Sequence, residues 1–132
     1  MVQQLELMQM LLEKSYEYGE HAGLGLIGGS VKPIAPMIGT GLKVPHIGWN
    51  RLIFPKDREK SKLFQYINEG DCVYFVHSYY LKAKDPSIVK ATTEYGVTIH
   101  ASVEKGNLFA CQFHPEKSST VGLQILKNFA EI

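Results

Sequence analysis

Several features that identify whole classes of protein are scarce in this chain. Its 132 residues include only two cysteines, Cys72 and Cys111, at a spacing that matches no metal-binding motif. This scarcity excludes a disulfide-rich secreted domain and favours a reduced, cytoplasmic protein. The 14 basic and 13 acidic residues nearly cancel, so the chain has no basic field that would attract nucleic acid.

Long hydrophobic runs are also missing. No apolar stretch reaches the roughly 18 residues that a transmembrane helix requires, and the first residues lack the charged start of a signal peptide. We therefore expect neither a membrane anchor nor secretion. With 45% hydrophobic and 20% charged residues, the composition is that of one globular domain.

The pattern of apolar residues in the first half predicts a mixture of helix and strand. Apolar residues recur at three- and four-residue intervals over residues 5–19, which predicts a helix. Short strands are expected within residues 23–31 and 47–54. One or two helical turns over residues 61–67 should end in a turn at residues 68–71.

The second half is richer in strand signals. Residues 72–80 are β-rich and should be buried on at least one face. Two further strands are expected near residues 89–95 and 97–103, with a break at Gly96, and a last strand over residues 107–113. The whole chain is thus predicted to be one compact α/β unit.

A final helix is expected after these strands. Either Ser118 or Ser119 should cap its N-terminus. One face of this helix should be apolar, formed by Val121, Ile125 and Phe129.

The glycines of residues 23–28 match the dinucleotide-binding pattern G-x-G-x-x-G. That site needs a strand before the glycines and a helix after them, so that the helix N-terminus meets the pyrophosphate. Here a predicted helix precedes the glycines, and Pro33 follows them closely. We interpret the segment as a glycine-rich turn into a strand.

Histidine is the residue type with the clearest chemical potential. The five histidines are His21, His46, His77, His100 and His114. None pairs with another histidine or a cysteine at ligand spacing, so no metal site is expected. His77 follows a buried strand and is interpreted as a buried or rim residue.

His114 differs from the other histidines because of its neighbours. Pro115 stiffens the backbone after it, and Glu116 can reach the same side as the imidazole. A histidine oriented by a carboxylate can act as general base for a serine or cysteine nucleophile. The same His-Pro-Glu sequence also suits a plain turn from strand to helix.

Neither cysteine is expected to be that nucleophile. Cys111 lies three residues before His114 on the predicted strand, so its side chain should point to the opposite face. A buried thiol in apolar surroundings has a raised pKa and is a poor nucleophile. Both cysteines are interpreted as structural.

Five segments, in order, resemble a single family. They are Met-Gln-Met-Leu-Leu-Glu-Lys-Ser at 8–15, Gly-Leu-Gly-Leu-Ile at 23–27, Lys-Val-Pro-His-Ile-Gly-Trp-Asn at 43–50, Tyr-Phe-Val-His-Ser-Tyr-Tyr at 74–80 and Gln-Phe-His-Pro-Glu-Lys-Ser at 112–118. From residue 8 onward the chain resembles the glutaminase subunits of imidazole glycerol phosphate synthase. These subunits are class I (triad) glutamine amidotransferases.

The resemblance implies a flavodoxin-like, three-layer α/β fold and a role in histidine biosynthesis in the cytoplasm. In this family a cysteine thiolate attacks the side-chain amide of glutamine, a histidine transfers the proton, and a glutamate orients that histidine. The ammonia passes to a cyclase (synthase) subunit, a (β/α)8 barrel, within a lyase complex. No cofactor takes part in the glutamine hydrolysis.

Carried onto this chain, the resemblance assigns catalytic and substrate-binding residues. His114 matches the general base, and Glu116 matches its orienting carboxylate. The residues that match the glutamine-binding positions are Gln9, Glu17, Ser78 and Tyr79.

The chain departs from the family at the nucleophile. The family places a cysteine, within Gly-x-Cys-x-Gly, four residues before the glutamine that Gln9 matches, and Leu5 stands there instead. The family also has an N-terminal segment with the first parallel strands and a Pro-Gly-x-Gly oxyanion loop. We expect residues 1–132 to be a single partial domain, the C-terminal two-thirds of a fold truncated at its N-terminus, inactive as a glutaminase alone. Two alternatives stay open: a non-catalytic docking module for the cyclase barrel, or an ammonia-supplying subunit of a sugar amidotransferase.

Overall fold

The computed structural model describes residues 12–15, 21–22, 27–34, 42, 44–106 and 108–132. Its strands are β1 (Leu12–Ser15), β2 (His21–Ala22), β3 (Ile27–Pro33), β4 (His46–Arg51), β5 (Cys72–His77), β6 (Tyr79–Ala83), β7 (Val89–Glu94), β8 (Thr98–Lys105) and β9 (Leu108–Cys111). Its helical elements are the 3₁₀ turns η2 (Lys62–Phe64), η3 (Pro86–Ile88) and η4 (Pro115–Lys117), and the helix α2 (Ser119–Ala130).

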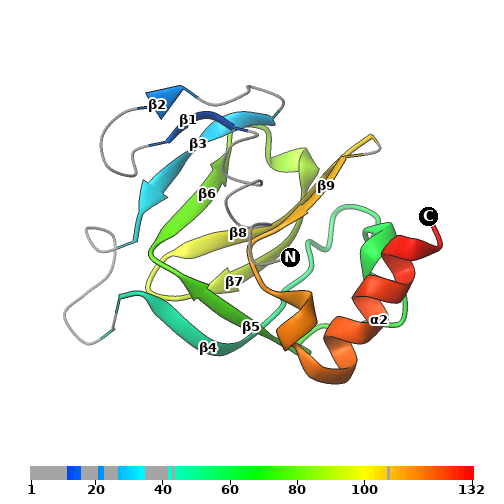
Figure 1. Cartoon of the computed structure of the whole chain (residues 1–132). Coiled ribbons are helices and arrows are strands. Elements are labelled where there is room, and N and C mark those ends of the chain that lie inside the picture. Colours follow the sequence, from blue (N-terminus) through cyan, green and yellow to red (C-terminus); the bar gives the residue numbers. More distant parts are fainter. Residues whose placement is uncertain (1–11, 16–20, 23–26, 35–41, 43, 107) are drawn as a thin grey trace.

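The strands form three small sheets, and α2 lies beside them (Figure 1). One sheet has the order β2-β1-β3-β6, a second pairs β4 with β5, and a third has the order β7-β8-β9. The pairing of β1 with β3 is parallel, and the other pairings within these sheets are antiparallel. A bridge between Ile53 and Thr92 connects the segment after β4 to β7. The described chain is therefore mixed α/β, as the sequence predicts.

The prediction of a helix over residues 5–19 is wrong where the structure describes it. Residues Leu12–Ser15 form strand β1, which pairs with β3 through Leu12 and Ile27 and through Lys14 and Ser30. Helical spacing of apolar residues is a local signal, whereas strand pairing depends on a neighbour that the spacing does not reveal. The rest of the predicted helix lies outside the described residues.

The strand predictions for the second half are confirmed. The run at residues 72–80 forms β5 and β6, which are separated only by Ser78. The break expected between β7 and β8 lies at Gly96, whose φ of 71° is in the left-handed region that glycine adopts without strain. The last predicted strand is β9, and the predicted helical turns before residue 68 correspond to η2.

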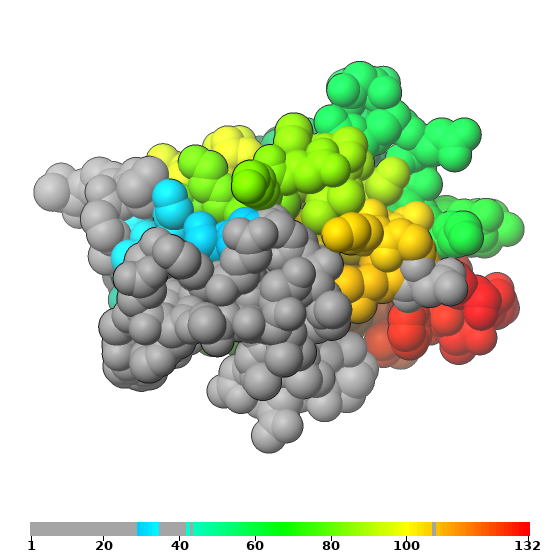
Figure 2. All heavy atoms as spheres, turned by 90° about the horizontal axis from the view of Figure 1, so that it is seen from above, coloured from blue at the N-terminus to red at the C-terminus, as the bar shows by residue number. Residues whose placement is uncertain are grey.

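The main hydrophobic core lies between α2, η2 and the sheets. Its aromatic centre is formed by Phe113, whose ring contacts Phe64 at 6.4 Å and Phe75 at 5.9 Å between centroids. From α2, Ile125 enters this core and is 2% exposed. Phe129, on the predicted apolar face, is 56% exposed, and its ring contacts Phe109 edge-on. Figure 2 shows α2 in red beside the orange residues of β9.

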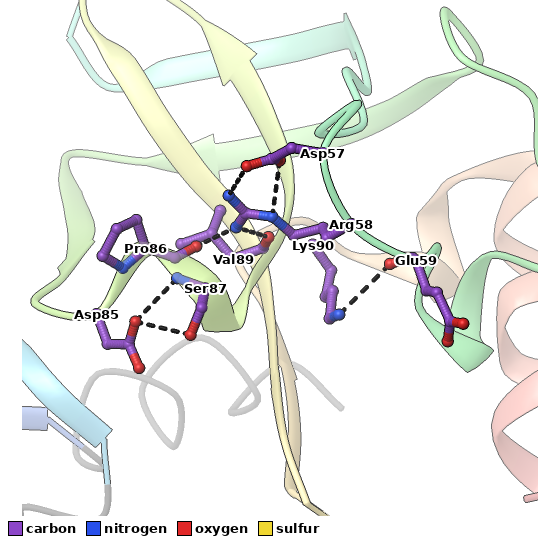
Figure 3. A network of polar contacts seen from close by, with 8 residues as sticks. All are labelled: Asp57, Arg58, Glu59, Asp85, Pro86, Ser87, Val89 and Lys90. Carbon is purple, nitrogen blue, oxygen red and sulfur yellow. Dashed lines mark hydrogen bonds and ion pairs between the residues drawn. The ribbon is translucent and has the colours of Figure 1, made fainter.

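A polar network fastens the segment before η2 to the start of β7 (Figure 3). The Arg58 guanidinium donates to the carbonyl oxygens of Pro86 and of Val89, the latter at 3.0 Å. The same guanidinium pairs with the Asp57 carboxylate at 3.1 and 3.3 Å. Because these carbonyls lie where η3 leads into β7, one side chain fixes the path of two segments that are distant in sequence.

Candidate active site

The site centres on His114, where the chain leaves β9 and turns toward α2. Its backbone is extended, and its N–H donates to the carbonyl of Tyr74 in β5 at 2.9 Å. Pro115 then begins the turn η4, consistent with the favoured place of proline in the first turn of a helix. The imidazole is only 3% exposed. The sheet therefore fixes the histidine backbone before the chain turns.

His114 and Glu116 form the dyad expected from their spacing. The Nδ1 atom of His114 lies 2.7 Å from Oε1 of Glu116, whose side chain is 24% exposed. An ionised carboxylate only accepts hydrogen bonds, so Nδ1 carries a proton and, in the neutral ring, Nε2 carries the lone pair. Nε2 is buried and has no hydrogen-bond partner among the described residues. The geometry thus leaves the basic nitrogen free for a reacting group.

The hydroxyl of Ser118 connects this turn to the neighbouring strand. It donates to the carbonyl of His114 at 2.6 Å and accepts from the N–H of Tyr74 at 3.0 Å. Ser118 stands at the N-cap position of α2, but it makes no side-chain capping bond there. Ser118 therefore occupies the predicted cap position without a capping hydrogen bond, because its hydroxyl is bound to β5 and to the His114 carbonyl, and Ser119 is already the first helical residue.

Gly122 allows α2 to approach the turn closely. A Cβ atom at this position would lie 1.8 Å from the carbonyl oxygen of Pro115, which no side chain tolerates. The N–H of Gly122 meanwhile donates to the carbonyl of Ser118 at 3.0 Å. Sequence reasoning missed this residue, and its only signal was a glycine inside a predicted helix, where glycine is unfavourable without a packing reason.

A second pair of buried side chains lies close by. Nδ1 of His46 is 2.9 Å from Nε2 of His77, and Nδ1 of His77 is 2.8 Å from the carbonyl oxygen of Tyr79. Burial lowers the pKa of each imidazole to about 4. For His77 the hydrogen bond to the Tyr79 carbonyl opposes this lowering, and the charges of His46 and His114 contribute to it. His77 is 6% exposed, so the prediction of a buried histidine is confirmed. The role of His46 was not predicted.

Comparison with known proteins agrees with this arrangement of residues. Residues 9–132 match the family model described as "Glutamine amidotransferase class-I". The chain belongs to the class I glutamine amidotransferase family.

Curated relatives are similar over nearly the whole chain. The imidazole glycerol phosphate synthase subunit HisH of Aquifex aeolicus is 48% identical over 122 residues, which are 92% of this chain and 56% of that protein. The HisH subunit of Moorella thermoacetica is 47% identical over 125 residues, 95% of this chain and 56% of the relative. That of Helicobacter hepaticus is 50% identical over 125 residues, 92% of this chain and 55% of the relative. This amidotransferase chain therefore spans little more than half the length of these relatives.

The two cysteines of this amidotransferase chain are poorly placed to act with His114. Burial, and secondarily the negative charge of Glu116, raise the pKa of the Cys111 thiol to about 12. That thiol donates instead to the carbonyl of Phe113 at 3.6 Å. Cys72 is exposed at the start of β5, with its thiol directed to the carbonyl of Gly70 at 3.7 Å.

The positions expected to bind glutamine are described only in part. Ser78 and Tyr79 form the bend between β5 and β6, and both are partly exposed. Gln9 and Glu17 lie outside the described residues. Over the ranges that the structure describes, no group of three or more potential ligand side chains is placed to hold a metal ion. In those same ranges, no helix has the length and apolarity needed to cross a bilayer.

Proposed function

We propose that this chain takes part in glutamine hydrolysis within an imidazole glycerol phosphate synthase, with His114 as general base and Glu116 as its orienting group. The supporting observation is the 2.7 Å contact that holds Nδ1 and leaves Nε2 buried and unpartnered. A base held in this way can take the proton of an attacking thiol at Nε2 and return it to the leaving ammonia.

The thiolate itself does not come from either cysteine of this chain. Residues 1–71 contain no cysteine, and Leu5 stands at the position that matches the family nucleophile. The raised pKa of Cys111 opposes thiolate formation, and the Cys72 thiol is directed elsewhere. Residues 1–132 span little more than half the length of the HisH relatives, and we expect these residues by themselves not to release ammonia from glutamine.

Glutamine is held at the bend between β5 and β6. Ser78 and Tyr79 are partly exposed there, and the preceding residue, His77, is near enough to His114 for the two side chains to interact electrostatically. Gln9 and Glu17 contribute the remaining contacts to the substrate. These four residues match the glutamine-binding positions of the family.

The partner is a cyclase subunit that receives the ammonia. The curated relatives are named as subunits of imidazole glycerol phosphate synthase. An apolar patch on β4 offers a docking surface, because Ile47 is 58% and Trp49 is 54% exposed on the same side of the strand. Exposed aromatic residues of this kind are typical anchors of protein interfaces.

A glutaminase assay tests the dyad. The nucleophile is supplied by a chimera in which the remaining N-terminal part of the Aquifex aeolicus relative precedes Gln9, and ammonia is measured in the presence of the cyclase subunit. His114→Asn and Glu116→Gln should each lower kcat by about 10²–10⁴-fold, whereas the exposed control Glu131→Gln should leave it unchanged. Full activity of the Glu116→Gln chimera would contradict the assigned role.

The unmodified chain tests the role of the nucleophile. No ammonia is expected from the 132-residue chain, with or without excess cyclase. Release that disappears in His114→Asn would show that Cys72 or Cys111 has become the nucleophile.

Binding measurements separate the alternative roles. Tight binding to the cyclase barrel without ammonia release in the chimera would favour a docking module, and Trp49→Ala should then weaken the complex. Ammonia transfer to a sugar amidotransferase in place of the cyclase would assign the chain to that alternative.

A further inference from the structure

His46 and His77 are an unusual choice for the interior of a small protein. They face each other across the β4–β5 ladder, and they are 3% and 6% exposed. Burying an imidazole is costly unless its polar atoms are hydrogen-bonded, so the partners of the two rings decide what the pair does.

The partners of the two rings fix the direction of every hydrogen bond. The carbonyl of Tyr79 only accepts, so His77 donates to it from Nδ1. Nε2 of His77 then accepts from Nδ1 of His46. At the far end, Nε2 of His46 faces the side-chain amide of Asn50 at 3.4 Å. The pKa values of about 4 keep both rings neutral at neutral pH, and in the neutral rings the hydrogen bonds run in this direction.

The ring of His46 has a single orientation. It is stacked on Phe75 at 4.9 Å between centroids and on Tyr95 at 4.0 Å, with interplanar angles of 19° and 22°. Its Nδ1–H therefore points steadily at His77. This donor binds the lone pair of Nε2 in the tautomer of His77 that the Tyr79 carbonyl requires, and so holds the His77 ring from its second nitrogen.

The Tyr79 carbonyl, which His77 binds, lies where the chain passes from one sheet to another. β5 pairs with β4 in one sheet, and β6 pairs with β3 in another, so the chain changes sheets across Ser78. The carbonyl of Ser78 accepts from the N–H of Ile34 at 3.0 Å. The bond from His77 to the Tyr79 carbonyl closes the bend from its other side.

We propose that His46 and His77 are a positioning pair that holds the backbone of Ser78 and Tyr79 in the orientation that binds glutamine. His77 fixes the Tyr79 carbonyl directly, and His46 acts through His77 by donating a hydrogen bond to its Nε2, which holds the ring in place. Neither side chain is assigned a contact with substrate. This inference rests on the glutamine site proposed above.

The tautomers provide a direct test. In ¹⁵N-labelled protein at neutral pH, both histidines should be protonated on Nδ1 and not on Nε2. His46→Phe keeps an aromatic ring between Phe75 and Tyr95 but removes the donor. In this variant Nε2 of His77 should lose its hydrogen bond while Nδ1 stays bound to the Tyr79 carbonyl, so the ¹⁵N resonance of Nε2 should shift. An unchanged His77 spectrum would overturn the role of His46.

Two replacements of His77 separate positioning from packing. His77→Asn keeps an N–H donor near the place of Nδ1, whereas His77→Phe fills the space without a donor. The amide of Ile34, which donates to the Ser78 carbonyl, should exchange about tenfold faster in His77→Phe, as expected for a bend weakened by one lost hydrogen bond, and close to the normal rate in His77→Asn. Amides of α2, such as that of Ile125, serve as the control for global stability. Equal exchange of Ile34 in both variants would overturn the proposal.

Glutamine binding, measured calorimetrically with the chain in complex with the cyclase subunit, completes the test. His77→Phe should weaken the Kd for glutamine by about tenfold, and His77→Asn should restore most of the affinity. If the unmodified chain binds glutamine and both variants bind it equally well, the positioning role is wrong and the proposed function stands. If the unmodified chain does not bind glutamine, the glutamine site is wrong, and the proposed orientation for glutamine is wrong with it.

Discussion

Acid should destabilise this protein well before its carboxylates are protonated, because of His46 and His77. Each has an ordinary pKa of 6.5 and a folded-state pKa of about 4. Between these values the unfolded chain binds more protons than the folded chain, so stability falls as the pH falls. The contribution of these two histidines to the free energy of unfolding is fully present above about pH 7 and is lost progressively as the pH falls toward 4.

The size of the effect follows from these two pKa values. At pH 5 an unfolded histidine is almost fully protonated, whereas a buried one is about nine-tenths neutral. This difference lowers the free energy of unfolding by roughly 2 kcal/mol per histidine. The pair should therefore remove about 4 kcal/mol between pH 7.5 and pH 5, a large part of the stability of a small domain. The lowered pKa of His100 acts in the same direction.

The single tryptophan provides the assay. Trp49 lies on β4, close to His46 in sequence, and its fluorescence can follow unfolding by urea at several pH values and constant ionic strength. The exposed carboxylates with a lowered pKa, Asp57, Glu69 and Asp85, have ordinary values of 3.8 to 4.5, so they contribute little above pH 5.

Matched variants assign the effect to the pair. His46→Phe should be less stable at pH 7.5, yet its unfolding free energy should depend less on pH, by about 2 kcal/mol over the same range. An unfolding free energy that stays constant from pH 7.5 to pH 5 in the unmodified protein would refute the reasoning. An equal pH dependence in both proteins would assign it to other groups.

Three further substitutions test the contacts around the site, each measured by urea unfolding. Gly122→Ala should cost about 1–3 kcal/mol because its Cβ would collide with the Pro115 carbonyl, whereas Leu123→Ala, at an exposed neighbouring position, should cost less than about 1 kcal/mol. Asn128→Leu should cost about 2–3 kcal/mol, since the buried amide donates to two carbonyls near η2, both at 2.8 Å. Arg58→Ala should cost about 1–2 kcal/mol by releasing the start of β7, and an equally stable variant would show that the network in Figure 3 is dispensable.

The sequence predicts local features of this protein better than contacts between distant segments. Residues 72–80 and 107–113 show β propensity in their own composition, and the dyad needs only a two-residue spacing, so both were predictable. The strand at Leu12–Ser15 was not predictable from local sequence, because its conformation depends on pairing with β3. The contact of His46 with His77 joins positions 31 residues apart and depends on the register of β4 against β5.

The hydroxyl of Ser118 illustrates the same limit. Its position before an apolar helix is the usual signal for a helix cap, and a local interpretation ends there. The hydroxyl instead binds backbone groups of His114 and of Tyr74, and Tyr74 lies 44 residues before Ser118 in the sequence. Ser118 stands at the N-cap, but the capping hydrogen bond is absent because its hydroxyl is already bonded to the backbone of β5 and of the turn.

Buried polar atoms without hydrogen-bond partners help to decide whether the His-Pro-Glu sequence serves only as a turn from strand to helix. Nε2 of His114 is buried without a partner among the described residues, and so are both polar atoms of the Gln112 side chain, which is fully buried. Each such group costs about 1–3 kcal/mol, and an apolar residue in its place would avoid that cost. A turn from strand to helix needs neither group, since Pro115 and Ser118 already make the turn and its hydrogen bonds. The cost is understandable if His114 is kept for a reacting group at Nε2, and His114→Leu should then give a more stable protein that has lost its place in glutamine hydrolysis. A His114→Leu variant that is less stable than the unmodified protein would instead favour a structural role for the histidine.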